Sequence, residues 1–99
     1  MSAIEMISHE RQRQINEDKE SLYKSNQLIG ELAEIGCVYA KCAILMLHGE
    51  ETEMMIAEGH WPFEEMELSD NPVENLVKAG AMIAAEIDRI TDMAQNELR

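Results

Sequence analysis

Two acidic residues, Glu31 and Glu34, stand one helical turn apart near the start of the most apolar stretch of the sequence, residues 28–47. Side chains three positions apart are neighbours on a helix surface, so these carboxylates could hold a divalent cation such as Mg²⁺ together. The same spacing is frequent on any acidic helix that faces water. The pair therefore leaves two functions open: an enzyme that uses a metal ion, and a binding protein with an acidic surface.

A second concentration of carboxylates occupies residues 50–70, where eight acidic side chains fall within 21 residues. A surface so rich in carboxylates could imitate the phosphates of a nucleic acid and occupy a basic groove on another protein. The alternative is an ordinary solvated acidic face. The expected partner-binding residues are these carboxylates and three apolar side chains among them: Glu50, Glu51, Glu53, Met54, Met55, Glu58, Trp61, Glu64, Glu65, Glu67 and Asp70.

The charge of the whole chain favours the same class of partner. Twenty Asp and Glu residues against eight Lys and Arg give a net charge of −12. This field repels nucleic-acid phosphates and anionic membranes, so we expect neither as a direct partner, whereas basic protein surfaces are attracted. No segment is long and apolar enough to span a membrane, and no basic region precedes an apolar run at the amino terminus. We therefore expect a cytoplasmic protein.

Other residue types that carry chemistry form no recognisable pattern. The histidines His9, His48 and His60 lack the spacing of zinc ligands, and the sequence has no Gly-rich phosphate loop and no serine or cysteine catalytic set. The cysteines Cys37 and Cys42 are five residues apart in one predicted helix and point to different sides, which excludes a disulfide between them. We interpret both as buried thiols in a reducing compartment.

The elements that must position these groups are helices. Over residues 28–47 apolar residues recur at alternating steps of four and three, which places them on one face of a helix, and Gly49 is a suitable carboxy-terminal cap. Glu31 and Glu34 flank this face. The predicted buried stripe is Leu28, Leu32, Ile35, Tyr39, Cys42 and Met46.

The last helix has the clearest start signal in the chain. Asn71 is a favourable cap, Pro72 takes the first helical position and Glu74 follows in the first turn. The apolar residues that follow have the same period as the central stripe, which predicts two long antiparallel helices, about 27–48 and 72–97. The predicted apolar line of this helix is Leu76, Gly80, Ile83, Ile87, Ile90 and Ala94.

An N-terminal helix and a short middle helix complete the predicted fold. Ser2 and Glu5 have the spacing of a capping box, and the segment before Gly59 could form the short helix. The fold class is all-α, a small helical bundle with a single domain over residues 1–99. A chain of 99 residues buries only about 60–70% of the surface it exposes when unfolded, so a second copy could complete the core as a homodimer.

Four segments resemble a family of small, all-helical proteins from phage and prophage genomes. They are ERQRQ at 10–14, GELAEIGCVYA at 30–40, WPF at 61–63 and LVKAGAMIAAEIDRI at 76–90. The family carries E-R-x-R-Q, G-E-L-A, W-P-[WF] and L-V-K-A-G-A-x-I-x-A-E-I-[ED]-R in this order. The resemblance covers most of the chain, and the last motif is the most specific. The family is distantly similar to MazG-like nucleotide pyrophosphohydrolases, which are all-α.

The distant similarity implies a metal-dependent reaction, in which carboxylates from facing helices bind Mg²⁺ beside a nucleoside triphosphate. Lys78 or Arg13 would then contact phosphate. Relatives carry a Gly-Trp and a His-Asp-Asp cluster between the first two motifs, whereas residues 16–22 of this chain read NEDKESL and offer only Asp18 and Glu20. The carboxylates that this alternative would use are Glu10, Glu31, Glu34 and Glu86.

Small size, acidity, phage-like motifs and the missing cluster together favour a binding protein over an enzyme. We expect a phage-encoded inhibitor or interaction module in the host cytoplasm, without catalytic residues, metal or cofactor. Its expected partner is a host protein with a basic surface, for example one involved in defence or nucleic-acid binding. The alternative remains a MazG-like, Mg²⁺-dependent pyrophosphohydrolase or a nucleotide-binding protein.

Overall fold

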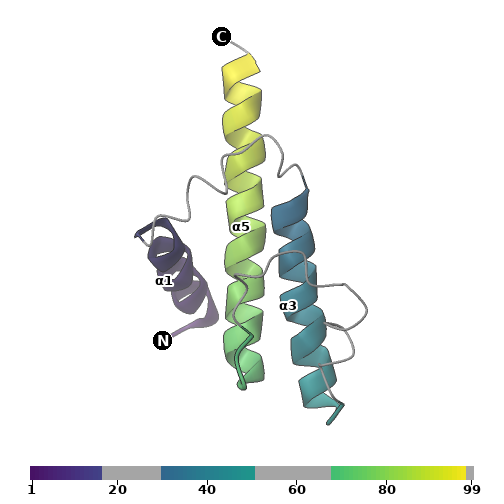
Figure 1. Ribbon diagram of the computed structural model, residues 1–99. Helices are drawn as coiled ribbons and strands as arrows, with labels where there is room; N and C mark the ends of the chain where they lie inside the picture. Colours follow the sequence, from purple (N-terminus) through teal and green to yellow (C-terminus); the bar gives the residue numbers. More distant parts are fainter. Residues whose placement is uncertain (17–29, 51–67, 98–99) are drawn as a thin grey trace.

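Three helices make up the described part of the chain, and the longest of them lies in the middle. A computed structural model describes residues 1–16, 30–50 and 68–97, without the side chains of Glu31 and of residues 93–97. The helices are α1 (Ala3–Asn16), α3 (Glu31–Leu47) and α5 (Pro72–Glu97). Figure 1 shows α5 between α1 and α3. The predicted all-α bundle is confirmed, while the short middle helix falls outside the described residues.

The helices α3 and α5 run antiparallel, as predicted (Figure 1). Gly36 lies against Ile83, and ten residues further along α3 the Met46 sulfur accepts a 3.2 Å hydrogen bond from the Asn75 side-chain amide. A Cβ at Gly36 would lie 3.1 Å from the backbone oxygen of Ala79. The absence of a side chain at this position therefore allows α3 to approach the backbone of α5 closely.

The ends of α3 differ slightly from the predicted 27–48. Gly30 has a φ of 80°, in the left-handed region, directly before the first helical residue, Glu31. At the other end Gly49 has a φ of 73° and its N–H donates to the Met46 carbonyl at 3.1 Å. Gly49 thus ends the helix as predicted, because glycine adopts this conformation without steric cost.

The amino-terminal starts of α1 and α5 follow the predicted capping chemistry. Ser2 and Glu5 form the capping box: the Glu5 N–H donates to Ser2 Oγ at 3.2 Å, and the Ser2 N–H donates to Glu5 Oε1 at 3.3 Å. At the start of α5, the Val73 N–H donates to Asn71 Oδ1 at 2.9 Å. Each side chain satisfies a backbone group that the first helical turn leaves without a partner.

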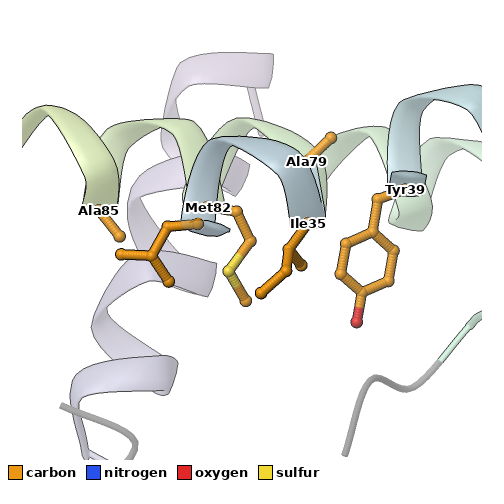
Figure 2. Packing of buried hydrophobic residues seen from close by; sticks show 6 residues of the cluster. Ile35, Tyr39, Ala79, Met82 and Ala85 are labelled. Atoms are coloured by element: carbon orange, nitrogen blue, oxygen red, sulfur yellow. The ribbon is translucent and has the colours of Figure 1, made fainter. Parts of the chain in front are cut away.

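The hydrophobic core lies on one side of the α3–α5 pair. Figure 2 shows Ile35 and Tyr39 of α3 and Met82 of α5 pointing to the same side of the two helices. The predicted stripe of α3 is confirmed from Leu32 to Cys42, whereas Leu28 falls outside the described residues. The buried cluster consists of Leu32, Ile35, Tyr39, Ala79, Met82 and Ala85.

The apolar line of α5 is not the buried side of this helix. Leu76, Ile83, Ile87 and Ile90 are exposed to solvent. The buried side of α5 is a different face of the helix. It combines small or flexible apolar residues with polar residues whose side chains have hydrogen-bond partners. Apolarity alone therefore selected the wrong face of this helix, because a paired polar side chain can be buried. The buried residues of α5 are Asn75, Ala79, Ala81, Met82, Ala85, Glu86 and Arg89.

Candidate functional site

A cavity of about 470 Å³ lies between α1 and the first two turns of α5. Its volume is within the range of small-molecule sites, about 300–1,000 Å³. Charged side chains from both helices line it together with methionines and valines, so it offers polar groups of both signs on an apolar floor. The lining residues are Met1, Met6, His9, Glu10, Arg13, Val73, Glu74, Val77 and Lys78.

Glu10 is the most strongly held carboxylate of this cavity. Arg13 donates to it twice, from Nε at 2.8 Å and from a terminal nitrogen at 2.5 Å, and the Gln14 amide donates at 3.4 Å. Burial raises the pKa of the Glu10 carboxyl, but the hydrogen bond and charge of Arg13, with the charge of Lys78 and the Gln14 hydrogen bond, outweigh burial and lower the pKa below its usual value. Glu10 is therefore ionised at neutral pH.

Lys78 approaches the same cavity from α5. Its ammonium nitrogen lies 5.8 Å from the centre of the Tyr39 ring, a cation–π distance. The structure therefore brings together Arg13 and Lys78, the two residues that the nucleotide interpretation expects near phosphate, and adds Glu10 beside them. This proximity comes from the packing of α1 on α5, where Ile7 lies over Gly80.

Glu86, another carboxylate of the expected metal set, has its own arginine partner. Arg89 Nε donates to Glu86 Oε2 at 2.6 Å, and both side chains are buried. Among the described residues the other carboxylate oxygen, Oε1, has no hydrogen-bond partner. An arginine three positions further along the helix thus partly neutralises Glu86, as Arg13 neutralises Glu10.

The remaining carboxylates of that set do not complete a site. Glu34 is exposed, and the side chain of Glu31 falls outside the described part of the structure. Within the described ranges no three His, Cys, Asp or Glu side chains come together in a group that could hold a metal ion. The geometry that a four-carboxylate metal centre requires is therefore not seen among these residues.

Of the predicted partner-binding residues the structure describes the first and the last, Glu50 and Asp70, and both are exposed. Glu50 follows the carboxy-terminal end of α3, and Asp70 precedes the amino-terminal end of α5. Because these helices are antiparallel, both residues belong to the same end of the pair (Figure 1). The other nine, from Glu51 to Glu67, lie outside the described residues.

Asn75 is a structural residue that sequence reasoning missed. The side chain is fully buried, and its Oδ1 accepts from the Ser69 N–H at 2.9 Å while its Nδ2 donates to the Ser69 carbonyl at 3.0 Å. Ser69 Oγ in turn donates to Glu74 and accepts from the Asn71 N–H. These bonds attach residues 69–71 to the first turn of α5. The sequence signal for this contact was an asparagine inside a predicted helix, six residues after a serine, because asparagine side chains commonly form hydrogen bonds with nearby backbone groups.

The two cysteines occupy different environments. Cys42 is buried, as predicted, and burial raises the pKa of its thiol. The interpretation of Cys37 as buried is wrong, since it is exposed. Cys37 lies outside the stripe that faces α5, and five residues in a helix turn its side chain well away from that of Cys42.

The chain matches no model of a known protein family, and no curated protein or solved structure is similar to it. The likeness to a phage family therefore depends on the four sequence motifs alone. In the part of the chain that the structure describes, no helix combines the length and the apolarity needed to cross a bilayer.

Proposed function

We propose that this chain is a phage-encoded, non-enzymatic binding protein that occupies a basic surface of a host protein in the host cytoplasm. The carboxylates of residues 50–70 form its binding surface, and Met54, Met55 and Trp61 add apolar contacts. The observation that carries this proposal is the way in which the protein uses its arginines.

The described arginines are each paired with a carboxylate of the same chain. Arg11 contacts Asp88 at 3.4 Å, and Arg13 and Arg89 hold Glu10 and Glu86. These positive charges therefore neutralise acidic groups on or between helices. With a net charge of −12, the surplus negative charge remains available to steer a basic partner.

The antiparallel helix pair brings the two ends of the acidic segment to the same end of the molecule (Figure 1). Exposed Glu50 and Asp70 mark the two ends of the acidic segment at one end of the α3–α5 pair, and exposed Glu74 lies in the first turn of α5 at that same end. The Asn75–Ser69 hydrogen bonds fix the chain where this segment enters α5. A partner would therefore meet a cluster of carboxylates at a defined end of the molecule.

Displacement of labelled DNA from purified, basic DNA-binding proteins of a bacterial host tests this proposal. We expect the chain to release the DNA from at least one of them, with fluorescence anisotropy as the readout, and the effect to weaken steeply with salt because exposed charges are screened. Replacing all eight carboxylates of residues 50–70 by their amides should abolish the release.

Two matched double variants separate a localised surface from net charge. Glu50→Gln with Asp70→Asn removes two exposed carboxylates of the proposed surface, and Glu34→Gln with Asp92→Asn removes two exposed carboxylates elsewhere. Only the first pair should weaken the displacement. Equal effects of both pairs, or no release from any protein of the panel, would contradict the proposal.

The cavity between α1 and α5 supports a second candidate function, a MazG-like, Mg²⁺-dependent pyrophosphohydrolase or a nucleotide-binding protein. The specific observation is that Arg13 and Lys78 line one cavity of nucleotide-compatible size together with Glu10. Cationic side chains of this kind bind phosphate oxygens, and a carboxylate beside them can contribute to a Mg²⁺ site.

Thermal unfolding with deoxynucleoside triphosphates and millimolar Mg²⁺ or Mn²⁺ tests the second candidate. A ligand that binds only the folded state raises the unfolding temperature, so a nucleotide-dependent rise that Lys78→Gln removes would support the cavity as the site. A rise that also requires the metal and is lost in Glu31→Gln would support the hydrolase. No rise with any nucleotide would exclude both versions.

A further inference from the structure

An exposed apolar face extends over both helices of the α3–α5 pair. We define it by six aliphatic residues whose exposure lies between 42% and 65%. Globular monomers expose single residues of this kind, but seldom six on two adjacent helices. The apolar face consists of Ile44 and Leu47 of α3 and Leu76, Ile83, Ile87 and Ile90 of α5.

Helical spacing places the four α5 residues of the apolar face in one row. Leu76, Ile83, Ile87 and Ile90 are separated by seven, four and three positions, which keeps them on one side of a helix. This row lies beside the buried side of α5, on which Met82 points into the core (Figure 2).

The α3 residues join this row where the two helices meet. A Cβ at Gly36 would lie 3.0 Å from Ile83 Cγ1, so these positions are in contact. Leu47 follows Gly36 by about three helical turns and lies on the same side of α3, and Ile44, three positions before Leu47, is its neighbour on the helix surface. The core occupies one side of the helix pair, and the apolar face lies along its junction.

The area of the apolar face suits an interface. With about 200 Å² for a fully exposed Leu or Ile, the six residues leave on the order of 600 Å² open to solvent. The largest apolar patches of typical monomers are about 300–600 Å², and each partner contributes about 800 Å² to a standard protein interface. The six residues with their neighbours therefore approach the area that a stable dimer buries.

We infer that a second copy of this chain covers the apolar face, with α5 packed antiparallel to α5 of the other copy. Three of the four residues of the α5 row, Leu76, Ile83 and Ile90, are symmetric about Ile83. In an antiparallel pair Ile83 meets Ile83 of the other copy, and Leu76 meets Ile90. The helix pairs of the two copies then form a four-helix core, since each supplies one apolar side.

The charge of the chain favours this occupant over a basic protein at the apolar face. None of the six residues carries a charge, whereas basic partners are attracted to the carboxylates, which the proposed function places at one end of the molecule. The length of α5 fits as well: in Figure 1 it continues beyond the start of α3 as a single helix. An antiparallel copy would lie along this end of α5 and support it, since an isolated stretch of helix is marginally stable in water.

Sedimentation velocity from micromolar to near-millimolar concentration tests the dimer. The unaltered chain should form a concentration-dependent dimer that tightens with added salt, because salt screens the repulsion between two acidic copies. Ile87→Glu should raise the dissociation constant by at least about 100-fold, since a two-fold interface contains the substitution twice. Ile87 is 58% exposed, so the variant should keep its helical circular dichroism.

The matched control is Lys41→Gln, which lowers the net charge by the same single unit at an exposed position outside the apolar face. It should dimerise like the unaltered chain. A chain that is monomeric at every concentration would overturn the inference and leave this face to other segments of the chain or to another protein. Equal weakening by both variants would also overturn it, because the effect would then be one of charge alone.

Cross-linking tests the antiparallel register separately. In a Cys37→Ser background, Ile83→Cys places a thiol at the two-fold axis, where the two copies come close enough for a disulfide. Mild oxidation should give a covalent dimer, whereas Leu76→Cys in the same background should not pair with itself. A sedimenting dimer that cross-links through residue 76 and not through residue 83 would overturn the proposed register.

Discussion

At the scale of single residues, two arginines form ion pairs with carboxylates of their own helix. Arg13 with Glu10 and Arg89 with Glu86 share a separation of three positions. Such pairs form as soon as the helix forms and need no contact from a distant segment. The burial of Arg89 and Glu86, however, comes from tertiary packing, which makes the loss of one of these two partners far more costly than it would be on an exposed helix.

The pair around Glu10 predicts a stability difference that depends on pH. The pKa of Glu10 is lower in the folded protein than its ordinary value of 4.5, so its stabilisation is present above pH 4.5 and is lost as the pH falls through the lowered value. Glu10→Gln should therefore unfold at lower temperature than the unaltered chain at neutral pH, and this gap should close in acid. Thermal unfolding across this pH range measures it.

Glu34→Gln is the matched control for that series, since Glu34 is exposed. Its unfolding temperature should stay close to that of the unaltered chain, because surface substitutions away from specific contacts change stability by less than about 0.5 kcal/mol. A gap for Glu10→Gln that persisted unchanged in acid would contradict the role of its ionised form.

The cysteines predict two distinct labelling rates. Cys37 is exposed, whereas Cys42 is buried and the pKa of its thiol is raised. Because the thiolate is the reactive form, an alkylating agent near neutral pH should modify Cys37 quickly and Cys42 only as the protein unfolds. Mass spectrometry of samples stopped at intervals distinguishes the two sites. Equal rates in the folded protein would place Cys42 at the surface.

At the scale of elements, the start of α5 depends on side-chain hydrogen bonds that its apolar pattern does not reveal. Asn75 binds both backbone groups of Ser69 and the sulfur of Met46. It thereby joins the residues before α5 to its first turn and, across the helix pair, to the last turn of α3. A buried amide with all these partners orders this end of the molecule.

Replacing Asn75 should accordingly cost more than replacing the cap itself. Asn75→Ala leaves the partly buried backbone groups of Ser69 without the Asn75 side chain and should lower the free energy of unfolding by about 2–3 kcal/mol. Asn71→Ala removes one exposed capping bond and should cost about 1 kcal/mol. Urea unfolding of both variants measures the difference. A smaller effect at Asn75 than at Asn71 would contradict this assignment.

Two glycines at helix–helix contacts should differ in how well they tolerate replacement by alanine. A Cβ at Gly36 would press on the Ala79 backbone oxygen at 3.1 Å, which moves only if α5 moves; at Gly80 it would meet the end of the Ile7 side chain, at 2.7 Å. Alanine gains about 1 kcal/mol of helix propensity at either site. Gly36→Ala should be destabilising by about 1–2 kcal/mol despite this gain, while Gly80→Ala should be near neutral.

Chemical denaturation of the two glycine variants provides the comparison. Both carry the same substitution inside a helix, so the difference between them reports the contact alone. Equal stability of the two variants would show that the backbone contact between α3 and α5 adjusts to a methyl group as easily as the Ile7 side chain does.

At the scale of the whole molecule, net charge and shape act against each other. The molecule measures 49 × 34 × 21 Å, and its shortest dimension is about twice the diameter of a helix. A flat arrangement of this kind leaves apolar helix sides at the surface, and we infer that a second copy covers them. The charge of −12 opposes both folding and association through self-repulsion.

This opposition predicts that salt stabilises the fold. Raising the ionic strength shortens the Debye length from about 30 Å at 0.01 M to about 3 Å at 1 M, so the unfolding temperature should rise with sodium chloride. The same trend should appear in the monomeric Ile87→Glu variant, which separates the effect on folding from the effect on dimerisation. An unfolding temperature that fell with salt would show that the internal ion pairs outweigh the repulsion.

The sequence by itself determined the helical class, the antiparallel pair and most helix ends. Capping is a local matter: Ser2 with Glu5, Asn71 with the N–H of Val73, and Gly49 with its positive φ act within a few residues, so the order of residue types specifies them. The stripe of α3 was equally readable from Leu32 to Cys42, because these apolar residues follow the period of a helix and are buried.

Only the tertiary structure decided which face of α5 is buried and which charges meet. The helix carries an aliphatic row and a row with Asn75, Glu86 and Arg89, and a lone helix gives no reason to bury the second. Packing buries the row whose polar side chains have hydrogen-bond partners in or next to α5, and the isoleucines remain outside. The cavity that joins Arg13 to Lys78 arises in the same way, since their positions are remote in the chain and depend on how α1 crosses α5.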